Sequence, residues 1–259
     1  MNAKQRKSSG CGCLGTILGI VIVVALIAVA AEFGMRFIIT KQINDTYDQL
    51  NSNRQVTATD NLAISYGTSP VLPVLVTDEI PHMTIKTPAT LEINDRAAAA
   101  GGPEIIGEPA STVEMDNLNV ANRNNPVAGT MVITSELSPE LIQAIANRRS
   151  TDLARISSLT PNTAEGVFDA EFTSGLVKAQ FRPVVRDGGL GMDIEGASVF
   201  GIEVGGVAQT LGDAALQGLT APIGHGLVAD DATVTDAGLL LRLRGENLPL
   251  STMRDIEYR

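Results

Sequence analysis

The most continuous apolar pattern in the chain lies near its N-terminus, where no side chain from Ser8 to Ala31 carries a charge. The aliphatic part of this run has no polar face, unlike the amphipathic helix of a soluble protein. A run of about 20 apolar residues matches the thickness of the hydrocarbon layer of a bilayer. The pattern therefore predicts a transmembrane helix over residues 14–34, and the cations before it place residues 1–13 in the cytoplasm.

Two fates remain open for this helix. We favour an uncleaved anchor, because the run is long for the apolar region of a signal peptide. Residues 35–259 would then form the extracytoplasmic domain of a single-pass plasma-membrane protein. The small residues Ala28-Val29-Ala30 instead fit a signal-peptidase site, and cleavage after Ala30 would release a periplasmic or secreted domain.

Beyond the apolar run, the pattern changes to short stretches in which apolar and polar residues alternate. Such alternation is typical of strands with one buried face. Turn residues such as Asp187-Gly188 and Asp236-Ala-Gly238 separate several of them and indicate hairpins. Strands are predicted at 56–59, 62–65, 80–86, 167–172, 176–182 and 190–194, with strand pattern resuming at 113 and a closing hairpin over 232–244.

Helices are predicted at fewer places. The first helix is expected to continue over 33–50 until the polar residues 51–53 break it. Ser-Pro-Glu at 138–140 has the cap, the proline and the acidic residue that are typical of a helix start. Residues 70–76 fit a short helix or an irregular turn, and 207–216 fit a short helix.

The stretch 97–109 is rich in alanine, glycine and proline, which indicates a mobile loop or a hinge. Because strand pattern resumes directly after it, we interpret it as a long hairpin connection inside one domain. The elements then predict an α+β fold, with a long curved antiparallel sheet wrapped on two or three helices. The chain lacks a repeating strand–helix–strand order, which argues against a doubly wound nucleotide-binding fold.

Charge narrows the choice of partners. The net charge is −10, and it becomes −13 once the three cations that precede the apolar run are set aside. Such an acidic domain is repelled by nucleic acid and by anionic headgroups, so the predicted anchor has to hold it at the membrane. The chain has no Trp and few other aromatic residues, and its aliphatic mass suits a core or a cavity for acyl chains.

Residues that carry chemistry are sparse. The only cysteines, Cys11 and Cys13, precede the apolar core and could be lipidated or unmodified, so the exported part has no disulfide. His82 and His225 lack a second His or Cys at metal-ligand spacing, and the chain has no Gly-x-Ser-x-Gly motif. We therefore predict no metal site, no cofactor and no catalytic residue.

Two pairs of cations suggest a binding role. Lys178 and Arg182 share one face of a predicted strand, and Arg242 and Arg244 share a face of another. If the two faces adjoin, these side chains could receive a lipid phosphate. The alternative is that all four are solvent-exposed decoration of their strands.

Three stretches, taken in order, resemble one family. They are Gly-Thr-Ser-Pro-Val-Leu-Pro-Val-Leu-Val at 67–76 with the strand at 80–85, the region 113–141 with Ile-Thr-Ser-Glu-Leu before its helix, and 234–241 with Gly-Glu-Asn-Leu at 245–248. Together they are similar to the LmeA-type phospholipid-binding proteins of actinobacterial cell envelopes, which are named for lipomannan elongation. The resemblance implies a tubular lipid-binding fold, in which a curved sheet wraps around a helix and leaves an apolar groove.

This resemblance implies a non-enzymatic envelope protein that binds phospholipid and supports lipoglycan (mannan) assembly, with envelope glycosyltransferases as possible partners. A scaffolding ectodomain of a membrane complex is the alternative, and an enzyme acting on lipid or glycan is a third. Lys178, Arg182, Arg242 and Arg244 are the candidate headgroup contacts. The residues predicted to contact lipid tails are Val71, Leu72, Leu75, Val76, Ile80, Met83, Ile85 and Phe181.

Overall fold

The computed structural model describes most of the chain. The strand predicted at 56–59 and the helix predicted at 207–216 lie outside the described residues, as do Cys11 and His225. The described residues are 12–54, 62–94, 103–148, 155–172, 177–199, 202–203 and 226–251.

The described elements confirm the predicted α+β class, because helices combine with strands that pair antiparallel throughout this part of the chain. The helices are α1 (Gly12–Arg54), α2 (Val74–Thr77) and α3 (Pro139–Arg148). The strands are β1 (Ala63–Ser65), β2 (Glu79–Thr87), β3 (Glu92–Asn94), β4 (Glu104–Ile106), β5 (Ser111–Asn119), β6 (Val127–Leu137), β7 (Ile156–Asn162), β8 (Val167–Phe172), β9 (Val177–Arg186), β10 (Gly189–Val199), β11 (Ile202–Glu203), β12 (Leu227–Thr235) and β13 (Gly238–Pro249).

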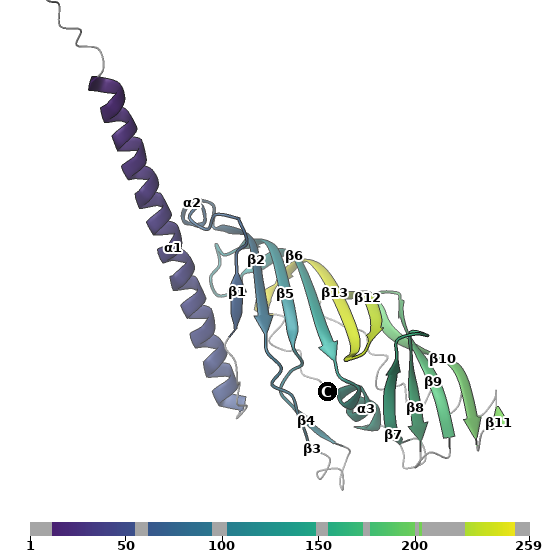
Figure 1. Ribbon diagram of the computed structural model, residues 1–259. Coiled ribbons are helices and arrows are strands. Elements are labelled where there is room, and N and C mark those ends of the chain that lie inside the picture. The colour runs from purple at the N-terminus through teal and green to yellow at the C-terminus, as the bar shows by residue number, and fades with distance from the viewer. Residues whose placement is uncertain are drawn as a thin grey trace, which may run out of the picture.

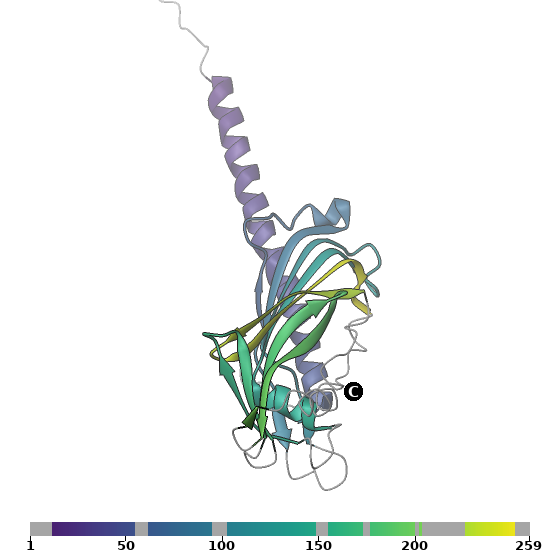
Figure 2. The same cartoon turned by 90° about the vertical axis from the view of Figure 1, so that its right-hand side faces the viewer.

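Helix α1 is one long rod whose two halves have different surroundings (Figures 1 and 2). Its N-terminal half projects beyond the sheets, and Val23, Leu26 and Val29 are each more than half exposed. The described span Ile22–Gln49 is long enough to cross a membrane, and an 18-residue window within it is apolar enough, with a mean hydropathy of 2.3. These features are compatible with the predicted single-pass anchor.

The end of α1 differs from the prediction. The polar residues 51–53 were expected to break the helix, but it continues to Arg54. Asn and Ser cost only about 0.7 kcal/mol or less per residue relative to Ala in a helix. Three of them near an end are therefore tolerated.

The larger sheet has six strands in the order β1-β2-β5-β6-β13-β12. β2 pairs with β5, which confirms the long hairpin connection predicted between them. Part of that connection has its own structure, because β3 and β4 pair as a small hairpin. The stretch 97–109, expected to be a mobile loop or a hinge, thus contains the strand β4.

The six-stranded sheet is curved (Figure 2), and a line of irregular residues crosses it. Pro81, Asn117, Gly129 and Asn247 lie at matching positions of neighbouring strands, where the regular pairing is interrupted. Both asparagines have a positive φ, 53° at Asn117 and 52° at Asn247. A Cβ on Gly129 would lie 3.0 Å from the Cβ of Asn117, so the strands approach closely at this glycine. Such irregularities increase twist and shift which side chains face the core.

The smaller sheet has five strands in the order β11-β10-β9-β8-β7. It shares an apolar core with α3 and with the hairpin end of β12 and β13, and Phe168, Phe172 and Phe181 lie in this core. Helix α3 begins as predicted, because the Oγ of Ser138 accepts a hydrogen bond from the Leu141 N–H at 3.3 Å. A second core, described next, lies between α1 and the six-stranded sheet.

Candidate functional site

Five aliphatic side chains form a row across the six-stranded sheet. The backbone register places Ile64 opposite Ile85, then Val113, Ile133 and Leu243 in turn. Directly opposed residues of antiparallel strands point to the same face of a sheet. All five are half-buried and pack against the core beside α1. We call Ile64, Ile85, Val113, Ile133 and Leu243 the aliphatic row.

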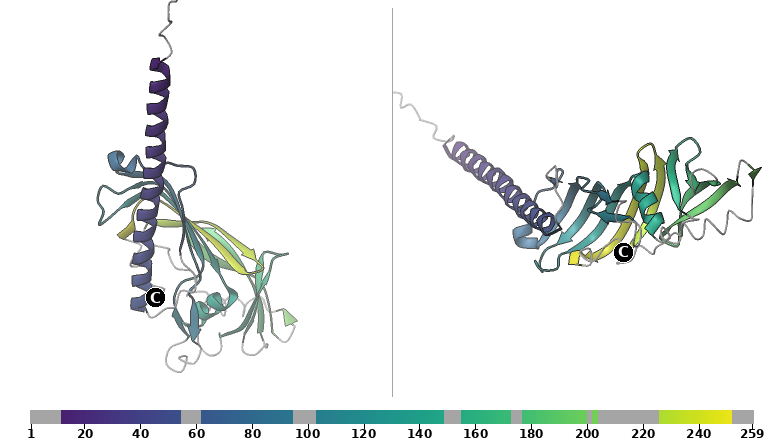
Figure 3. Two further views of the ribbon diagram at one scale, coloured as in Figure 1. Left: turned by 60° about the vertical axis from the view of Figure 1, so that its left-hand side comes forward. Right: turned by 90° about the horizontal axis from the view of Figure 1, so that it is seen from below.

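The aliphatic row is closed on one side by a fully packed layer. Met83, Met115 and Met131 lie opposite one another, each two residues from a member of the row on the same strand. Each of the three side chains is at most 3% exposed. Met35, Ile39 and Ile43 of α1 pack against the same cluster. Helix α1 therefore packs against the sheet beside the row, and the left part of Figure 3 shows α1 passing in front of the sheet.

On its other side the row borders hydroxyl groups. Thr87, Ser111 and Ser135 lie opposite one another, again two residues along the strands. The two serine Oγ atoms are 2.7 Å apart, and the Thr87 hydroxyl donates to the Ser111 carbonyl oxygen at 3.2 Å. The face thus changes from buried methionine through half-buried aliphatic side chains to hydroxyl groups, which is an amphipathic gradient.

Glu32 and Arg36 of α1 hydrogen-bond to the backbone of the loop over residues 69–72, and we call this arrangement the Glu32 clamp. The Glu32 carboxylate accepts hydrogen bonds from the N–H groups of Val71 and Leu72, each at 2.8 Å at its shortest. Arg36 donates to Glu32 at 2.7 Å and to the Ser69 carbonyl oxygen at 2.8 Å. The clamp therefore fixes the 69–72 loop to one turn of α1, at the level where α1 leaves the rest of the protein (Figure 1).

Replacing Glu32 by Ala should loosen this loop. The change leaves the Val71 and Leu72 N–H groups without their acceptor, and a hydrogen bond to a charged group is worth about 2 kcal/mol. We expect hydrogen exchange at these two amides to become about 30-fold faster, measured by mass spectrometry. Asp45→Ala is the matched control, because Asp45 is an exposed carboxylate of the same helix. Equal exchange rates in the two variants would contradict the clamp.

The structure distributes the predicted tail contacts over different surroundings. Ile85 belongs to the aliphatic row, whereas Phe181 lies in the core of the five-stranded sheet. Val71, Ile80 and Met83 are fully buried near α1, Leu72 is half-buried, and Leu75 and Val76 are exposed. The remaining members of the row, Ile64, Val113, Ile133 and Leu243, were not singled out from the sequence.

The four predicted headgroup cations each meet a carboxylate. Lys178 pairs with Glu171 at 2.7 Å and Arg182 pairs with Glu195; the hydrogen bond from Arg182 lowers the pKa of Glu195 below its usual value. On the other sheet, the partners are Asp230 for Arg242, at 3.3 Å, and Glu246 for Arg244, at 3.5 Å. Because β9 and β13 belong to different sheets, the structure does not bring the two pairs onto one strand face. Their contact with a headgroup stays a prediction.

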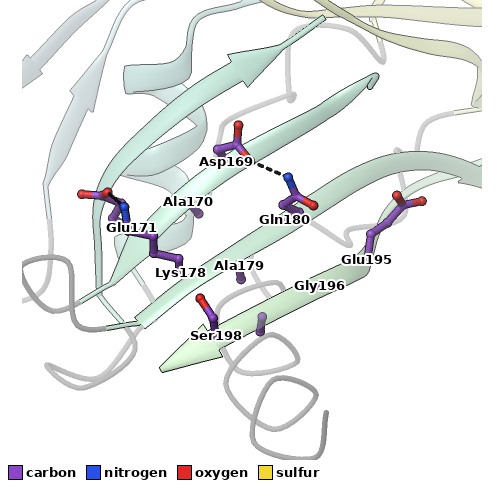
Figure 4. A pocket seen from close by; sticks show the side chains of 10 residues that line it. Asp169, Ala170, Glu171, Lys178, Ala179, Gln180, Glu195, Gly196 and Ser198 are labelled. Atoms are coloured by element: carbon purple, nitrogen blue, oxygen red, sulfur yellow. Dashed lines mark hydrogen bonds and ion pairs between the residues drawn. The ribbon is translucent and has the colours of Figure 1, made fainter. Parts of the chain in front are cut away.

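An open hollow of about 700 Å³ lies on the five-stranded sheet (Figure 4). Its lining includes three carboxylates, Asp169, Glu171 and Glu195, and Lys178 reaches toward Glu171. Gln180 donates to Asp169 at 2.9 Å. Charged, hydrogen-bonded side chains on the wall of this hollow disfavour an acyl chain. The aliphatic row is therefore the better candidate for lipid tails.

One chain of polar residues was missed in the sequence. His82 Nδ1 lies 2.7 Å from an Asp116 carboxylate oxygen, and its Nε2 lies 3.2 Å from the Thr84 hydroxyl. A hydroxyl, an imidazole and a carboxylate in this order resemble a nucleophilic triad. They lie on the face opposite Met83, away from the aliphatic row, and Asp116 is exposed. Their spacing on β2 and β5 explains the contacts as an exposed cross-strand network.

The comparisons with known proteins point in the same direction as this geometry. A family model described as LmeA-like phospholipid-binding matches residues 33–244. Neither the curated proteins nor the solved structures include a match to the chain. The matched range contains β1, β2, β5, β6 and β12 of the six-stranded sheet, the first part of β13, and the half of α1 that packs against the sheet.

Proposed function

Because this chain belongs to the LmeA-like phospholipid-binding family, we propose that it is a membrane-anchored, non-enzymatic protein that holds a phospholipid tail on the aliphatic row. The observation that supports this proposal most strongly is the strand register, which aligns five aliphatic side chains across five strands. They are Ile64, Ile85, Val113, Ile133 and Leu243. Such a continuous, half-buried aliphatic surface beside a helix is what a hydrocarbon chain requires.

The size of the row suits one tail. Neighbouring strands lie about 4.8 Å apart, so five strands give a row of about 19 Å. A single lipid tail spans about half of the roughly 30 Å hydrocarbon layer of a bilayer. The row can therefore accommodate one tail along its length, with the hydroxyl groups of Thr87, Ser111 and Ser135 beside it.

The chemistry of the row supports binding rather than turnover. Its own side chains are aliphatic, and the flanking hydroxyl groups of Ser111 and Ser135 bond each other. The imidazole of His82, which could act as a base, lies on the opposite face of the sheet. An aliphatic surface lowers the free energy of a lipid by burying its tail, at about 0.8 kcal/mol per CH₂ group.

The finer role that we propose is support of envelope lipid or lipoglycan (mannan) assembly outside the cytoplasmic membrane. The resemblance to envelope proteins of actinobacteria supports it, and so does the apolar helix that would hold an acidic domain beside its lipid. In this role the protein would present or accept phospholipid near envelope glycosyltransferases. Lys178, Arg182, Arg242 and Arg244 remain the proposed headgroup contacts.

A polar substitution in the row tests the proposal. We expect Ile133→Gln to reduce phospholipid uptake about 10-fold, because an unpaired amide on an apolar surface costs about 1–3 kcal/mol. Val132→Gln is the matched control, because Val132 is the next residue of the same strand and faces the other side. The measurement is quantitative lipid mass spectrometry of the chain from residue 31 onward after incubation with phospholipid vesicles.

This shortened chain retains Glu32, Arg36 and the α1 residues that pack on the sheet, but lacks the projecting apolar segment. Bound lipid then reports on the folded domain rather than on the anchor. A protein that is empty and takes up no phospholipid would contradict the proposal and favour a scaffolding ectodomain. Equal uptake by Ile133→Gln and Val132→Gln would contradict the assignment to the aliphatic row.

A further inference from the structure

The short helix α2 turns aliphatic side chains toward solvent. Leu75 is 67% exposed and Val76 is 87% exposed, whereas Val71, four residues before Leu75, is completely buried. The sequence around α2 is aliphatic, and the described contacts of α2 use only Val74 against the core. Leu75 and Val76 are thus an exposed apolar pair on the segment that connects β1 to β2. Exposed apolar surface of this kind often marks a contact with a partner or a membrane.

The position of α2 identifies that partner. The Glu32 clamp holds Val71 and Leu72 against α1, and α2 begins two residues later at Val74. Figures 1, 2 and 3 agree that α2 lies at the end of the protein from which the apolar half of α1 projects. A bilayer crossed by that half of α1 would therefore have its surface at the level of α2.

The exposed surface of α1 continues the apolar character at this level. Phe33 is 68% exposed and Phe37 is 70% exposed, and both follow directly on the projecting segment. Aromatic rings are enriched at the boundary between hydrocarbon and water. Asp78 and Glu79 follow α2, so the contact would be apolar and would not depend on anionic lipid.

We infer that Leu75 and Val76 of α2 insert into the interface of the bilayer that α1 crosses, forming a second membrane contact beside the anchor. The inference rests on the proposed membrane anchoring of α1. With two contacts, α1 and α2, the six-stranded sheet would keep a fixed orientation, with the end of the sheet nearest α2 facing the lipid surface.

Single tryptophans can locate α2, because the natural chain contains no Trp. The full chain would be reconstituted into phosphatidylcholine vesicles, with and without bromine on the lipid tails, as Val76→Trp, Val23→Trp and Glu140→Trp. Val23 lies in the projecting half of α1, and Glu140 is exposed on α3 at the opposite end of the protein (Figure 1). Brominated tails quench the fluorescence only of a tryptophan that reaches them.

We expect Val23→Trp and Val76→Trp to lose most of their fluorescence in brominated vesicles and Glu140→Trp to keep its fluorescence. Quenching of Val76→Trp no stronger than that of Glu140→Trp, with Val23→Trp quenched, would overturn the α2 contact and leave the anchor intact. An unquenched Val23→Trp would overturn the anchoring and the α2 contact together. Neither result depends on lipid uptake by the aliphatic row, so the proposed lipid binding is tested separately from the membrane contacts.

Discussion

Shortening a single-chain phospholipid by two methylene groups should weaken its binding to this protein about 15-fold. Each buried CH₂ group contributes about 0.8 kcal/mol, so two contribute about 1.6 kcal/mol. The expectation follows from the proposed site, the aliphatic row, where a bound tail would meet Ile85, Val113 and Ile133 rather than polar groups. Calorimetric titration of the chain from residue 31 onward, with monomeric lipids of increasing tail length, measures the series.

The variants of strand β6 supply the control for this series. Ile133→Gln should bind each lipid more weakly, whereas Val132→Gln should reproduce the unmodified series, because its side chain faces away from the row. An affinity that stays constant as the tail lengthens would show that the headgroup alone is recognised. That outcome would contradict a tail-binding row.

Replacing Phe168 by Ala should cost about 3–5 kcal/mol of stability, the usual range for a buried phenylalanine. Phe168 is 1% exposed and lies opposite Phe181 in the five-stranded sheet. Phe172 and Phe181 make an edge-to-face contact with ring centroids 6.0 Å apart in the same core. The cavity left by Phe168 would therefore remove packing that neighbouring aromatic rings cannot restore without moving.

Denaturant unfolding followed by circular dichroism measures this loss. Val185→Ala, on β9 of the same sheet, is the control and should cost much less, because Val185 is 37% exposed. Under conditions where Phe168→Ala stays folded, its lipid affinity should be unchanged, because the aliphatic row belongs to the other core. A variant that is stable but unable to bind lipid would place the lipid in the five-stranded sheet instead.

Local patterns in the sequence were sufficient to predict many of the strands and hairpins of the fold. The alternation of Leu190, Met192 and Ile194 predicted β10, and these side chains pack in the core as expected. The turn at Asp187-Gly188 is confirmed by the pairing of β9 with β10 and by positive φ values of 51° and 72°. Hairpins are predictable in this way because their pairing partners are adjacent in the sequence.

Elements whose stability depends on distant partners were harder to predict. Strand β7, Ile156–Asn162, was not predicted, since it is rich in polar residues and contains Pro161. It is the edge strand of its sheet, where a proline is tolerated because one side needs no pairing. The stretch 97–109 gave a similar result, since β4 pairs with β3 and lies against α3.

The candidate site could be predicted only in part for the same reason. Ile85 was identified because its strand alternates clearly, but its alignment with Val113, Ile133 and Leu243 depends on the register between distant strands. A shift of one residue would turn any of these side chains to the opposite face. The sequence alone also could not assign Phe181 to a different core from Ile85, because local alternation does not reveal which sheet a strand joins.

Photo-crosslinking tests the central claim most directly. A phospholipid with a photoactivatable diazirine on its tail would be bound to the chain from residue 31 onward, irradiated, and mapped by peptide mass spectrometry. Binding on the aliphatic row predicts labels on β2, β5, β6 and β13, at or beside Ile85, Val113, Ile133 and Leu243. Labels confined to the five-stranded sheet around Phe181 or Lys178 would contradict it.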